Sequence, residues 1–138
     1  FVAGFIGSPA MNFFPGTQRR DDGKIVVDGG SFNLKIPDHL IETYTEHLDK
    51  EVIFGIRPED IHNPEFAPPG IIAQPVESTV DVTELMGNEI FVYLKTGENV
   101  FVARVDPRSR YQVNDNVQVV FNMENMHIFD KETEDTIN

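Results

Sequence analysis

Several features that are common in enzymes and secreted proteins are missing from this sequence of 138 residues. It contains no cysteine, which excludes disulfides, thiol nucleophiles and cysteine-based zinc sites. No apolar run approaches the ~18 residues that a membrane-spanning helix needs. The sequence has no G-x-x-x-x-G-K-[ST] loop for nucleotide phosphates and no G-x-S-x-G turn for a nucleophilic serine. These absences argue against the commonest hydrolase and nucleotide-binding sites.

Histidine and positive charge are also scarce. The four histidines form no H-x-x-x-H or H-x-H pair, so no metal site is predicted from them. Lysine and arginine number 11 against 23 aspartates and glutamates, which gives a net charge of -12. A surface this acidic repels the phosphate backbone, and we therefore expect no nucleic-acid partner.

What the sequence does contain is a series of short apolar runs separated by turn signals, which is typical of a mainly β protein built as a small barrel or sandwich. A helix is predicted over residues 37–49 from its apolar spacing. Gly29-Gly30 and the stretch 96–99 are predicted hairpin connections. The predicted strands are residues 24–28, 31–36, 52–57, 74–85, 89–95, 100–105 and a last pair, 117–122 with 126–130.

The stretch 74–85 shows the clearest strand pattern. Val76, Ser78, Val80 and Val82 alternate with polar residues, so all four are expected on one face. The dipeptide that follows, Gly87-Asn88, is a tight-turn signal and predicts a positive φ at the glycine.

The domain organisation is predicted from the ends and the proline content. The chain opens on "FVAGFIGSP", apolar and without methionine, which suggests a piece of a longer protein. Residues 63–70 hold three prolines and a glycine and form the best internal boundary. We therefore expect one regulatory region, 1–138, made of a linker helix and first strand (1–14), a first β-rich part (15–70) and a second (71–138).

The stretch "VIFGIRPEDI" (52–61) is the candidate for chemistry. Glu59 and Asp60 beside Arg57 are compatible with acid–base catalysis in a free-standing hydrolase. However, Pro58 suits the first position of a helical turn, and acids in that turn favour the helix dipole. The pattern therefore favours a structural corner at the end of a strand.

Four stretches together resemble one family: "FVAGFIGSPAMNFF" (1–14), "VIFGIRPEDI" (52–61), "VDVTELMGNEIFVYL" (80–94) and "MHIFDKETEDTI" (126–137). They are similar to the C-terminal region of the ATP-binding subunits of sugar-importing ABC transporters, which include the maltose and multiple-sugar importers. The resemblance implies OB-fold-like β-barrel elements, often called a TOBE or MOP-like domain, with one or two short helices.

The resemblance also implies a function. The family's ATPase domain precedes this region and carries the nucleotide motifs, so this region is not an enzyme and holds no cofactor, while ATP and Mg belong to the missing domain. The implied partners are a second copy of the region in a homodimer, the ATPase domain, the membrane permease subunits and, in some members, a regulatory protein. The implied location is the cytoplasm, at the inner face of the cell membrane.

The resemblance places seven structural or interface candidates. Gly55, Arg57, Pro58 and Glu59 match the family's G-I-R-P-E stretch, while Glu84, Gly87 and Glu89 match its barrel motif. None is implied to be catalytic, cofactor-binding or metal-binding. The alternative function is an oxyanion-binding barrel of the molybdate type, which the acidic composition disfavours because oxyanions need convergent donors or cations.

Overall fold

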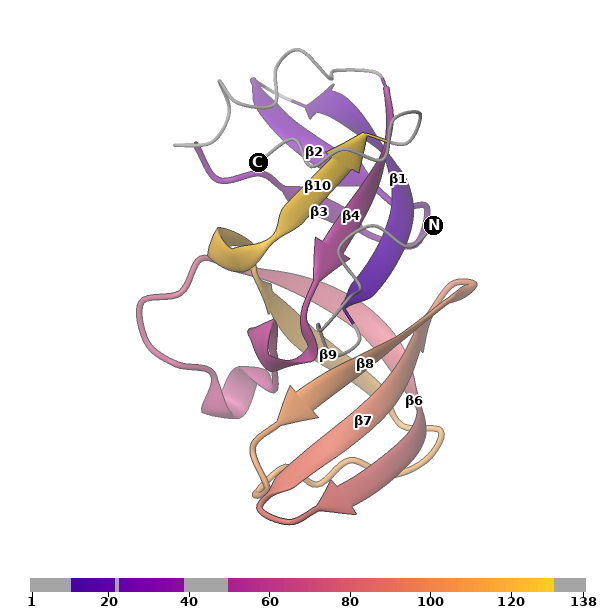
Figure 1. The fold of residues 1–138 in the computed structure, drawn as a ribbon, viewed down its shortest axis with the longest axis vertical. Helices are drawn as coiled ribbons and strands as arrows, with labels where there is room; N and C mark the ends of the chain where they lie inside the picture. Colours follow the sequence, from indigo (N-terminus) through magenta and orange to yellow (C-terminus); the bar gives the residue numbers. More distant parts are fainter. Residues whose placement is uncertain (1–10, 22, 39–49, 131–138) are drawn as a thin grey trace.

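The computed structural model describes residues 11–21, 23–38 and 50–130. The predicted helix 37–49 and the linker helix within 1–14 therefore fall mostly outside the described residues. Within them the protein is mainly β, as predicted, and Figure 1 shows an upper and a lower group of strands. None of the helices in these described ranges is long and apolar enough to cross a bilayer.

Each group of strands is one five-stranded sheet, and every described pairing is antiparallel. The upper sheet has the order β10-β4-β1-β2-β3 and the lower one β5-β9-β6-β7-β8. The upper strands are β1 (Asn12–Asp21), β2 (Lys24–Asp28), β3 (Asn33–Lys35), β4 (Glu51–Ile56) and β10 (His127–Asp130). The lower strands are β5 (Ile61–His62), β6 (Ala73–Met86), β7 (Glu89–Thr96), β8 (Asn99–Val105) and β9 (Asn116–Asn122).

Two predicted hairpins are confirmed, but with different connection lengths. The β2–β3 pairing ends at Asp28 and Asn33, so residues 29–32 form a four-residue loop, which the Gly29 N–H closes by donating to the Phe32 carbonyl at 3.0 Å. The β7–β8 pairing continues to Thr96 and Asn99. Its turn therefore has only two residues and uses a φ of 58° at Gly97, as tight hairpin turns require.

The predicted pairing of residues 117–122 with 126–130 is wrong. The short 3₁₀ helix η5 (Met123–Asn125) separates them, and β9 stays in the lower sheet while β10 pairs with β4 in the upper one. Met123, which begins this turn, and Met126, which follows it, are buried, so the turn is anchored in the core. The predicted second part of the chain thus contributes a strand to the sheet of the first.

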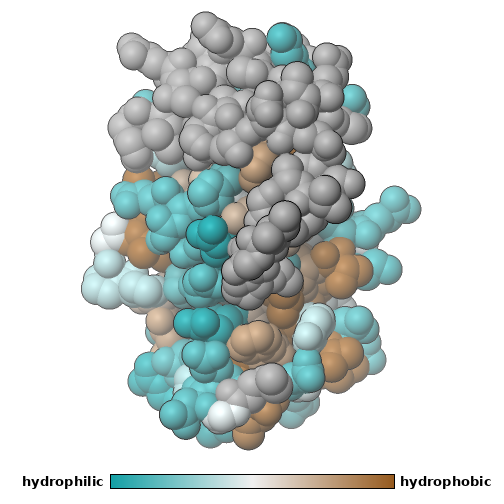
Figure 2. Space-filling model, in the orientation of Figure 1, coloured by the Kyte–Doolittle hydropathy of each residue, from teal (hydrophilic) through white to brown (hydrophobic). Residues whose placement is uncertain are grey.

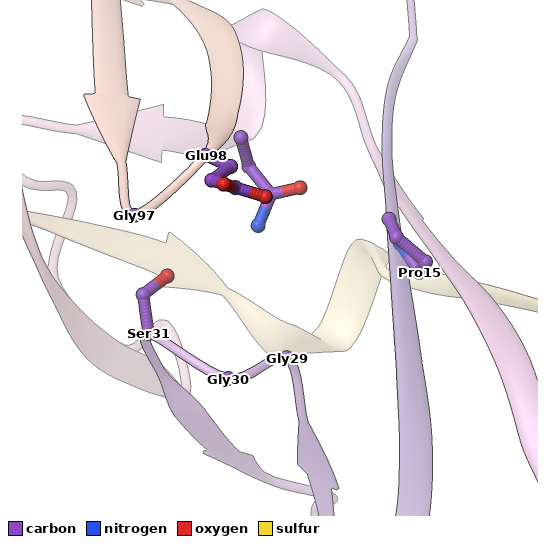
Figure 3. Close-up of a pocket in the computed structure, with 7 residues that line it drawn as sticks. Pro15, Gly29, Gly30, Ser31, Gly97 and Glu98 are labelled. Carbon is purple, nitrogen blue, oxygen red and sulfur yellow. The ribbon is translucent and has the colours of Figure 1, made fainter.

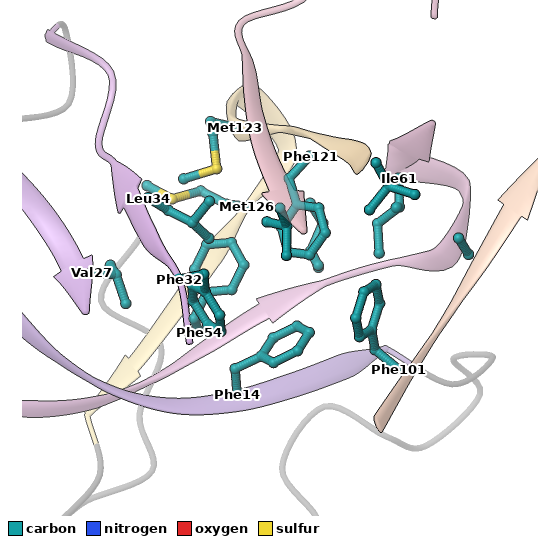
Figure 4. Packing of buried hydrophobic residues seen from close by; sticks show 14 of the residues in the cluster. Phe14, Val27, Phe32, Leu34, Phe54, Ile61, Phe101, Phe121, Met123 and Met126 are labelled. Atoms are coloured by element: carbon teal, nitrogen blue, oxygen red, sulfur yellow. The ribbon is translucent and has the colours of Figure 1, made fainter. Parts of the chain in front are cut away.

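One continuous apolar core joins the two sheets. Phe14 of β1 lies 5.4 Å from Phe101 of β8 and 5.9 Å from Phe121 of β9 between ring centroids. Phe54 of β4 stacks on Phe121 at 6.1 Å. Figure 4 shows these rings converging from strands of both sheets. Aromatic pairs at such distances add to the stability that area burial supplies.

A side chain also joins the sheets at the edge of β8. The Asn12 amide donates to the Val102 carbonyl at 2.8 Å, and the Val102 N–H donates to the Asn12 side-chain oxygen at 2.9 Å. The amide of Asn12 thus satisfies both backbone groups of one edge residue, as a neighbouring strand would.

The alternation predicted along residues 74–85 breaks within β6. Val76, Ser78 and Val80 are buried as expected, but Val82 is 45% exposed. The pairing with β7 skips a residue between Val80 and Val82, so Asp81 forms a β-bulge. A bulge inserts one residue and reverses the faces beyond it, and Val82 therefore lies on the outer face.

Candidate functional site

Within the described residues, the chain crosses between the two sheets at one corner. It leaves the upper sheet from β4 through the 3₁₀ helix η3 (Pro58–Asp60) and returns from β9 through η5 to β10. The Asn125 side-chain amide donates to the Asp60 carboxylate at 2.8 Å. This bond ties the two crossings together, and we call residues 57–60 with 124–127 the crossover corner.

Gly55, the first candidate of this stretch, is required for close packing. It is buried in β4 and lies between Phe13 of β1 and His127 of β10 in the register of the sheet. A Cβ atom at this position would lie 2.8 Å from the Met11 sulfur and 3.1 Å from a ring carbon of Phe129. The glycine is therefore a packing requirement.

Arg57, Pro58 and Glu59 build the outgoing crossing. Pro58 is buried and occupies the start of η3, while Arg57 precedes it in an extended conformation. The Asp60 N–H donates to the Arg57 carbonyl at 3.0 Å. Glu59 lies in the first turn, where a carboxylate favours the positive end of the helix dipole. The predicted turn begun by proline is confirmed.

A hollow of about 500 Å³ opens at this corner, and charged and polar groups line it. Partial burial lowers the pKa of His127, an effect to which Arg57 adds and which Asp60 opposes. Partial burial also lowers the pKa of His62, and the nearby Asp60 carboxylate opposes this by raising it. The lining residues are Arg57, Glu59, Asp60, Glu124, Asn125, Met126 and His127.

The crossover corner presents charged and polar side chains. Its carboxylates and guanidinium can form ion pairs and hydrogen bonds with a partner. One oxygen of Asp60 is already engaged by Asn125. No group of three or more metal-ligating side chains converges anywhere in the described ranges.

The second set of candidates surrounds the β6–β7 turn. Met86 and Glu89 are the last pair of the ladder, so Gly87 and Asn88 form a two-residue turn. Gly87 has a φ of 64°, which confirms the predicted positive value. The structure does not bring this set to the crossover corner, because it lies at the far end of the lower sheet (Figure 1).

The two glutamates of this set lie on the outer face of the lower sheet. Glu84 is opposite Phe91 in the β6–β7 register and accepts a hydrogen bond from Tyr93, which raises the pKa of that hydroxyl. Glu89 lies 3.5 Å from the Arg104 guanidinium of β8. Both glutamates thus pair with side chains of neighbouring strand positions while remaining accessible.

Sequence reasoning missed a second hollow, of about 440 Å³, between two hairpin tips. Figure 3 shows Gly29, Gly30 and Ser31 of the β2–β3 loop facing Gly97 and Glu98 of the β7–β8 turn. The Thr96 and Ser31 hydroxyls are 3.0 Å apart. Glycine in both loops was the available signal, but no local pattern indicates that two tips so far apart in sequence meet.

The hairpin hollow offers few groups to an anion. The Gly29 N–H is used by the Phe32 carbonyl, and the Gly30 N–H donates to the Asp28 carboxylate at 2.9 Å. The Glu98 carboxylate lines the same hollow. Oxyanion sites need convergent donors or cations, and the N–H groups of Gly29 and Gly30 are already engaged.

Known proteins resemble this chain over nearly all of its length. It is 43% identical to the oligosaccharides import ATP-binding protein MsmX of Bacillus subtilis (strain 168), with 97% of this chain and 36% of MsmX aligned. It is 41% identical to the trehalose/maltose import ATP-binding protein MalK of Thermococcus litoralis, with 96% of this chain and 36% of MalK aligned. The chain therefore spans about a third of the length of these relatives.

A solved structure shares the fold. Molybdate-bound ModG, a cytoplasmic molybdate-binding protein, superposes with a TM-score of 0.63 at 14% identity, over 88% of this chain and 97% of ModG. Two families match the sequence: the MalK OB fold domain over residues 7–61 and the TOBE domain over residues 54–129. The predicted resemblance is confirmed, and the chain belongs to the TOBE domain family, with a MalK-type OB fold in its first part.

Proposed function

We propose that this chain is the regulatory and dimerisation domain of the ATP-binding subunit of an ABC-type carbohydrate importer. The observation that carries the proposal is its identity of about 40%, from end to end, with sugar-import ATP-binding proteins of which it spans about a third. In this proposal the domain hydrolyses nothing itself, and ATP and Mg bind to an ATPase domain in the same parent subunit.

The remaining partners follow from that role. The parent subunit lies in the cytoplasm against the inner face of the membrane, where it works with permease subunits. A second copy of the domain supplies the homodimer contact, and a regulatory protein is a further partner. The accessible polar groups of the crossover corner and the two glutamates of the β6–β7 hairpin are the interface candidates within this proposal.

Binding of molybdate or a similar oxyanion is the second candidate, because ModG has a related fold. The resemblance at 14% identity concerns the fold alone. The engaged backbone donors of the β2–β3 loop and the carboxylate of Glu98 disfavour an anion there. The net charge of -12 disfavours it further.

Calorimetric titration distinguishes these functions. We expect the 138-residue chain to give no specific heat of binding with Mg-ATP or with molybdate. Micromolar binding of molybdate would favour the oxyanion function, and micromolar binding of Mg-ATP would contradict the assignment of nucleotide binding to a separate domain.

Sedimentation of the same chain tests the dimer contact. We expect a weak monomer–dimer equilibrium that shifts toward dimer as salt rises from low to moderate, because salt screens repulsion between two chains of net charge -12. A strict monomer at millimolar concentration would remove self-contact from the proposed function.

A further inference from the structure

The hairpin hollow carries less charge than two other hollows of the described chain. Among the described residues that line it, only Glu98 is charged. The crossover corner is lined by one arginine and three acids, and a hollow of about 480 Å³ beside β3 is lined by two lysines and Asp38. Figure 2 shows that hydrophilic and apolar surface alternate over the visible face of the molecule, so a hollow with little charge is not a general feature of this surface. The remaining residues that line the hairpin hollow are Pro15, Gly29, Gly30, Ser31, Gly97 and Asn99.

The two hairpin tips that form the hollow are held in place by their own hydrogen bonds. The Asp28 carboxylate accepts from the Gly30 N–H at 2.9 Å and pairs with the Arg19 guanidinium at 3.0 Å. The Thr96 hydroxyl donates to the Ser31 hydroxyl oxygen at 3.0 Å, which joins one tip to the other. A preformed site binds its ligand without the cost of ordering loops. The hollow therefore meets a first requirement of a binding site.

Glycine leaves the space between the tips open. A Cβ atom at Gly29 would overlap the ring of the buried Phe32, so the loop backbone packs directly on that ring. At Gly30 no atom lies within 4 Å of the place where a Cβ would be, so the loop backbone is open to a ligand there. The hollow of about 440 Å³ is near the lower end of the roughly 300–1,000 Å³ of small-molecule sites. It suits a ligand of about one or two six-membered rings.

The hollow offers both acceptors and donors that the described residues leave unused. Figure 3 shows the Glu98 side chain reaching into the gap opposite Ser31. The Glu98 carboxylate and the Asn99 side-chain amide have no partner among the described residues. The Ser31 hydroxyl accepts from Thr96 and keeps its own proton to donate. A carboxylate, an amide and a hydroxyl thus surround one small space.

Sugar hydroxyls match this set of groups. Each hydroxyl both donates and accepts, so a ring with several of them can satisfy a carboxylate and an amide together. An oxyanion would be repelled by Glu98. Ammonium ligands are typically held on aromatic faces, and no aromatic side chain lines the described part of the hollow. Pro15 supplies an apolar ring surface against which the C–H face of a sugar can pack.

We propose that the hairpin hollow binds a neutral carbohydrate of about one or two rings, with Glu98 and Asn99 as the side chains that bind its hydroxyls. The class of ligand follows from the residues that line the hollow. Its identification with the imported sugar rests on the proposed function. Loops that connect the strands of OB-type barrels are recurrent binding sites, for oligosaccharides among other ligands.

A sugar bound in the hollow contacts both sheets at once. Ser31 belongs to the β2–β3 loop of the upper sheet, and Glu98 belongs to the β7–β8 turn of the lower sheet. The ligand therefore binds the arrangement in which the two tips meet, and it stabilises that arrangement more as its concentration rises above the Kd. A regulatory domain with this site responds to the amount of sugar that the importer has delivered.

Titration of the 138-residue chain followed by NMR tests the site. Maltose and glucose should shift the backbone amide signals of residues 29–31 and 97–99, with a Kd on the order of 1–10 mM because few groups hold the ligand. Glu98→Gln should weaken binding roughly five- to tenfold, since a charged acceptor makes the stronger hydrogen bonds. Glu77→Gln is the matched control, because it makes the same change at an exposed position of β6 outside the hollow. It should alter the Kd by less than about twofold.

Charged probes test the class of ligand. A glucose monophosphate should bind more weakly than glucose, because Glu98 repels it, and Glu98→Gln should reduce that difference. Glucose binding should not change with salt, whereas binding of an amine would weaken.

Three results would overturn the inference. They are the absence of shifts at the two tips with about 50 mM maltose or glucose, a Glu98→Gln variant that binds like the wild-type chain, and tighter binding of spermidine than of glucose at the tips. The proposed function would remain, because its assignment of nucleotide binding to a separate domain is tested by the titration with Mg-ATP. Conversely, binding of Mg-ATP would contradict that assignment while sugar-dependent shifts at the tips still supported the site.

Discussion

The crossover corner and the outer face of β6–β8 contain most of the residues that the sequence analysis selected, and they use their side chains differently. At the corner, Pro58 is buried and Asp60 is bonded to Asn125 of the returning crossing. On the outer face, Glu84 and Glu89 lie on the same side of the sheet as the exposed Val82 and two partly buried aromatic side chains. The difference indicates that the corner maintains the join between the sheets, while the face is available to a partner.

The largest difference should appear on overpacking β4, the strand that leads into the corner. Gly55→Val places a branched side chain where even a Cβ atom lies 2.8 Å from the Met11 sulfur. We expect a loss of about 1–3 kcal/mol in the free energy of unfolding. The matched change on the face, Val82→Thr, should cost under ~0.5 kcal/mol because the side chain is exposed. Urea denaturation of both variants measures this, and equal losses would contradict the division.

A second test compares two glycine turns. Gly87 and Gly97 both have a positive φ, which costs roughly 1–2 kcal/mol for alanine. Only at Gly97 would the new Cβ also meet a neighbour, the Cβ of Ser31 at 2.8 Å, whereas nothing lies within 4 Å at Gly87. Gly97→Ala should therefore lower the thermal midpoint more than Gly87→Ala.

Removing the neighbour sharpens this test. In the background of Ser31→Gly, the cost of Gly97→Ala should fall toward that of Gly87→Ala, because the steric conflict is gone. If the cost is unchanged, the hairpin tips do not touch as the structure indicates.

A smaller effect is expected from acid. The folded protein lowers the pKa of His127 and His62 below the ordinary value of 6.5. The unfolded chain therefore binds more protons once the pH falls through 6.5, and stability decreases toward the lowered pKa values. We expect denaturation midpoints to decrease from about pH 7.5 to about pH 5.5. His127→Gln should reduce that slope, and an unchanged slope would remove His127 from the effect.

The smallest change should come from the face itself. Glu89→Gln removes an exposed ion pair with a 3.5 Å separation from Arg104. Such pairs contribute little, so the free energy of unfolding should change by less than ~0.5 kcal/mol. Urea denaturation of the variant beside the wild-type protein measures this change. A loss above ~1 kcal/mol would contradict the division, because the face would then contribute to stability as the corner does.

Local patterns predicted most of the strands but not their partners. β4, β6 and β7 were evident because alternation, glycine turns and proline boundaries act over a few residues. The assignment of β10 to the upper sheet was missed, since it depends on how Met123 and Met126 enter the core. The exposure of Val82 was missed because a bulge has no strong signature in a single sequence, and hydrophobic alternation continues through it unchanged.

As with the strands, the role of a candidate residue could be predicted where it depends on local backbone geometry, but not where it depends on residues distant in sequence. Pro58 and Gly87 could be interpreted from backbone requirements alone. The pairing of Glu84 and Glu89 with side chains of neighbouring strands became visible only when the registers aligned β6, β7 and β8. The hairpin hollow required two loops that are distant in sequence, which no periodicity encodes.

The return of β10 to the upper sheet also has a consequence for the order of events during synthesis. Residues 52–55 of β4 pair with β1 on one edge and with residues 127–130 of β10 on the other. At ~5–20 residues per second, the ribosome needs several seconds to make the chain between β4 and β10. During that interval β4 can pair with β1 but its other edge is open. Long-range pairing of this kind slows folding. The first sheet to be translated is thus the last to be completed, because its edge strand β10 is made only after every strand of the lower sheet.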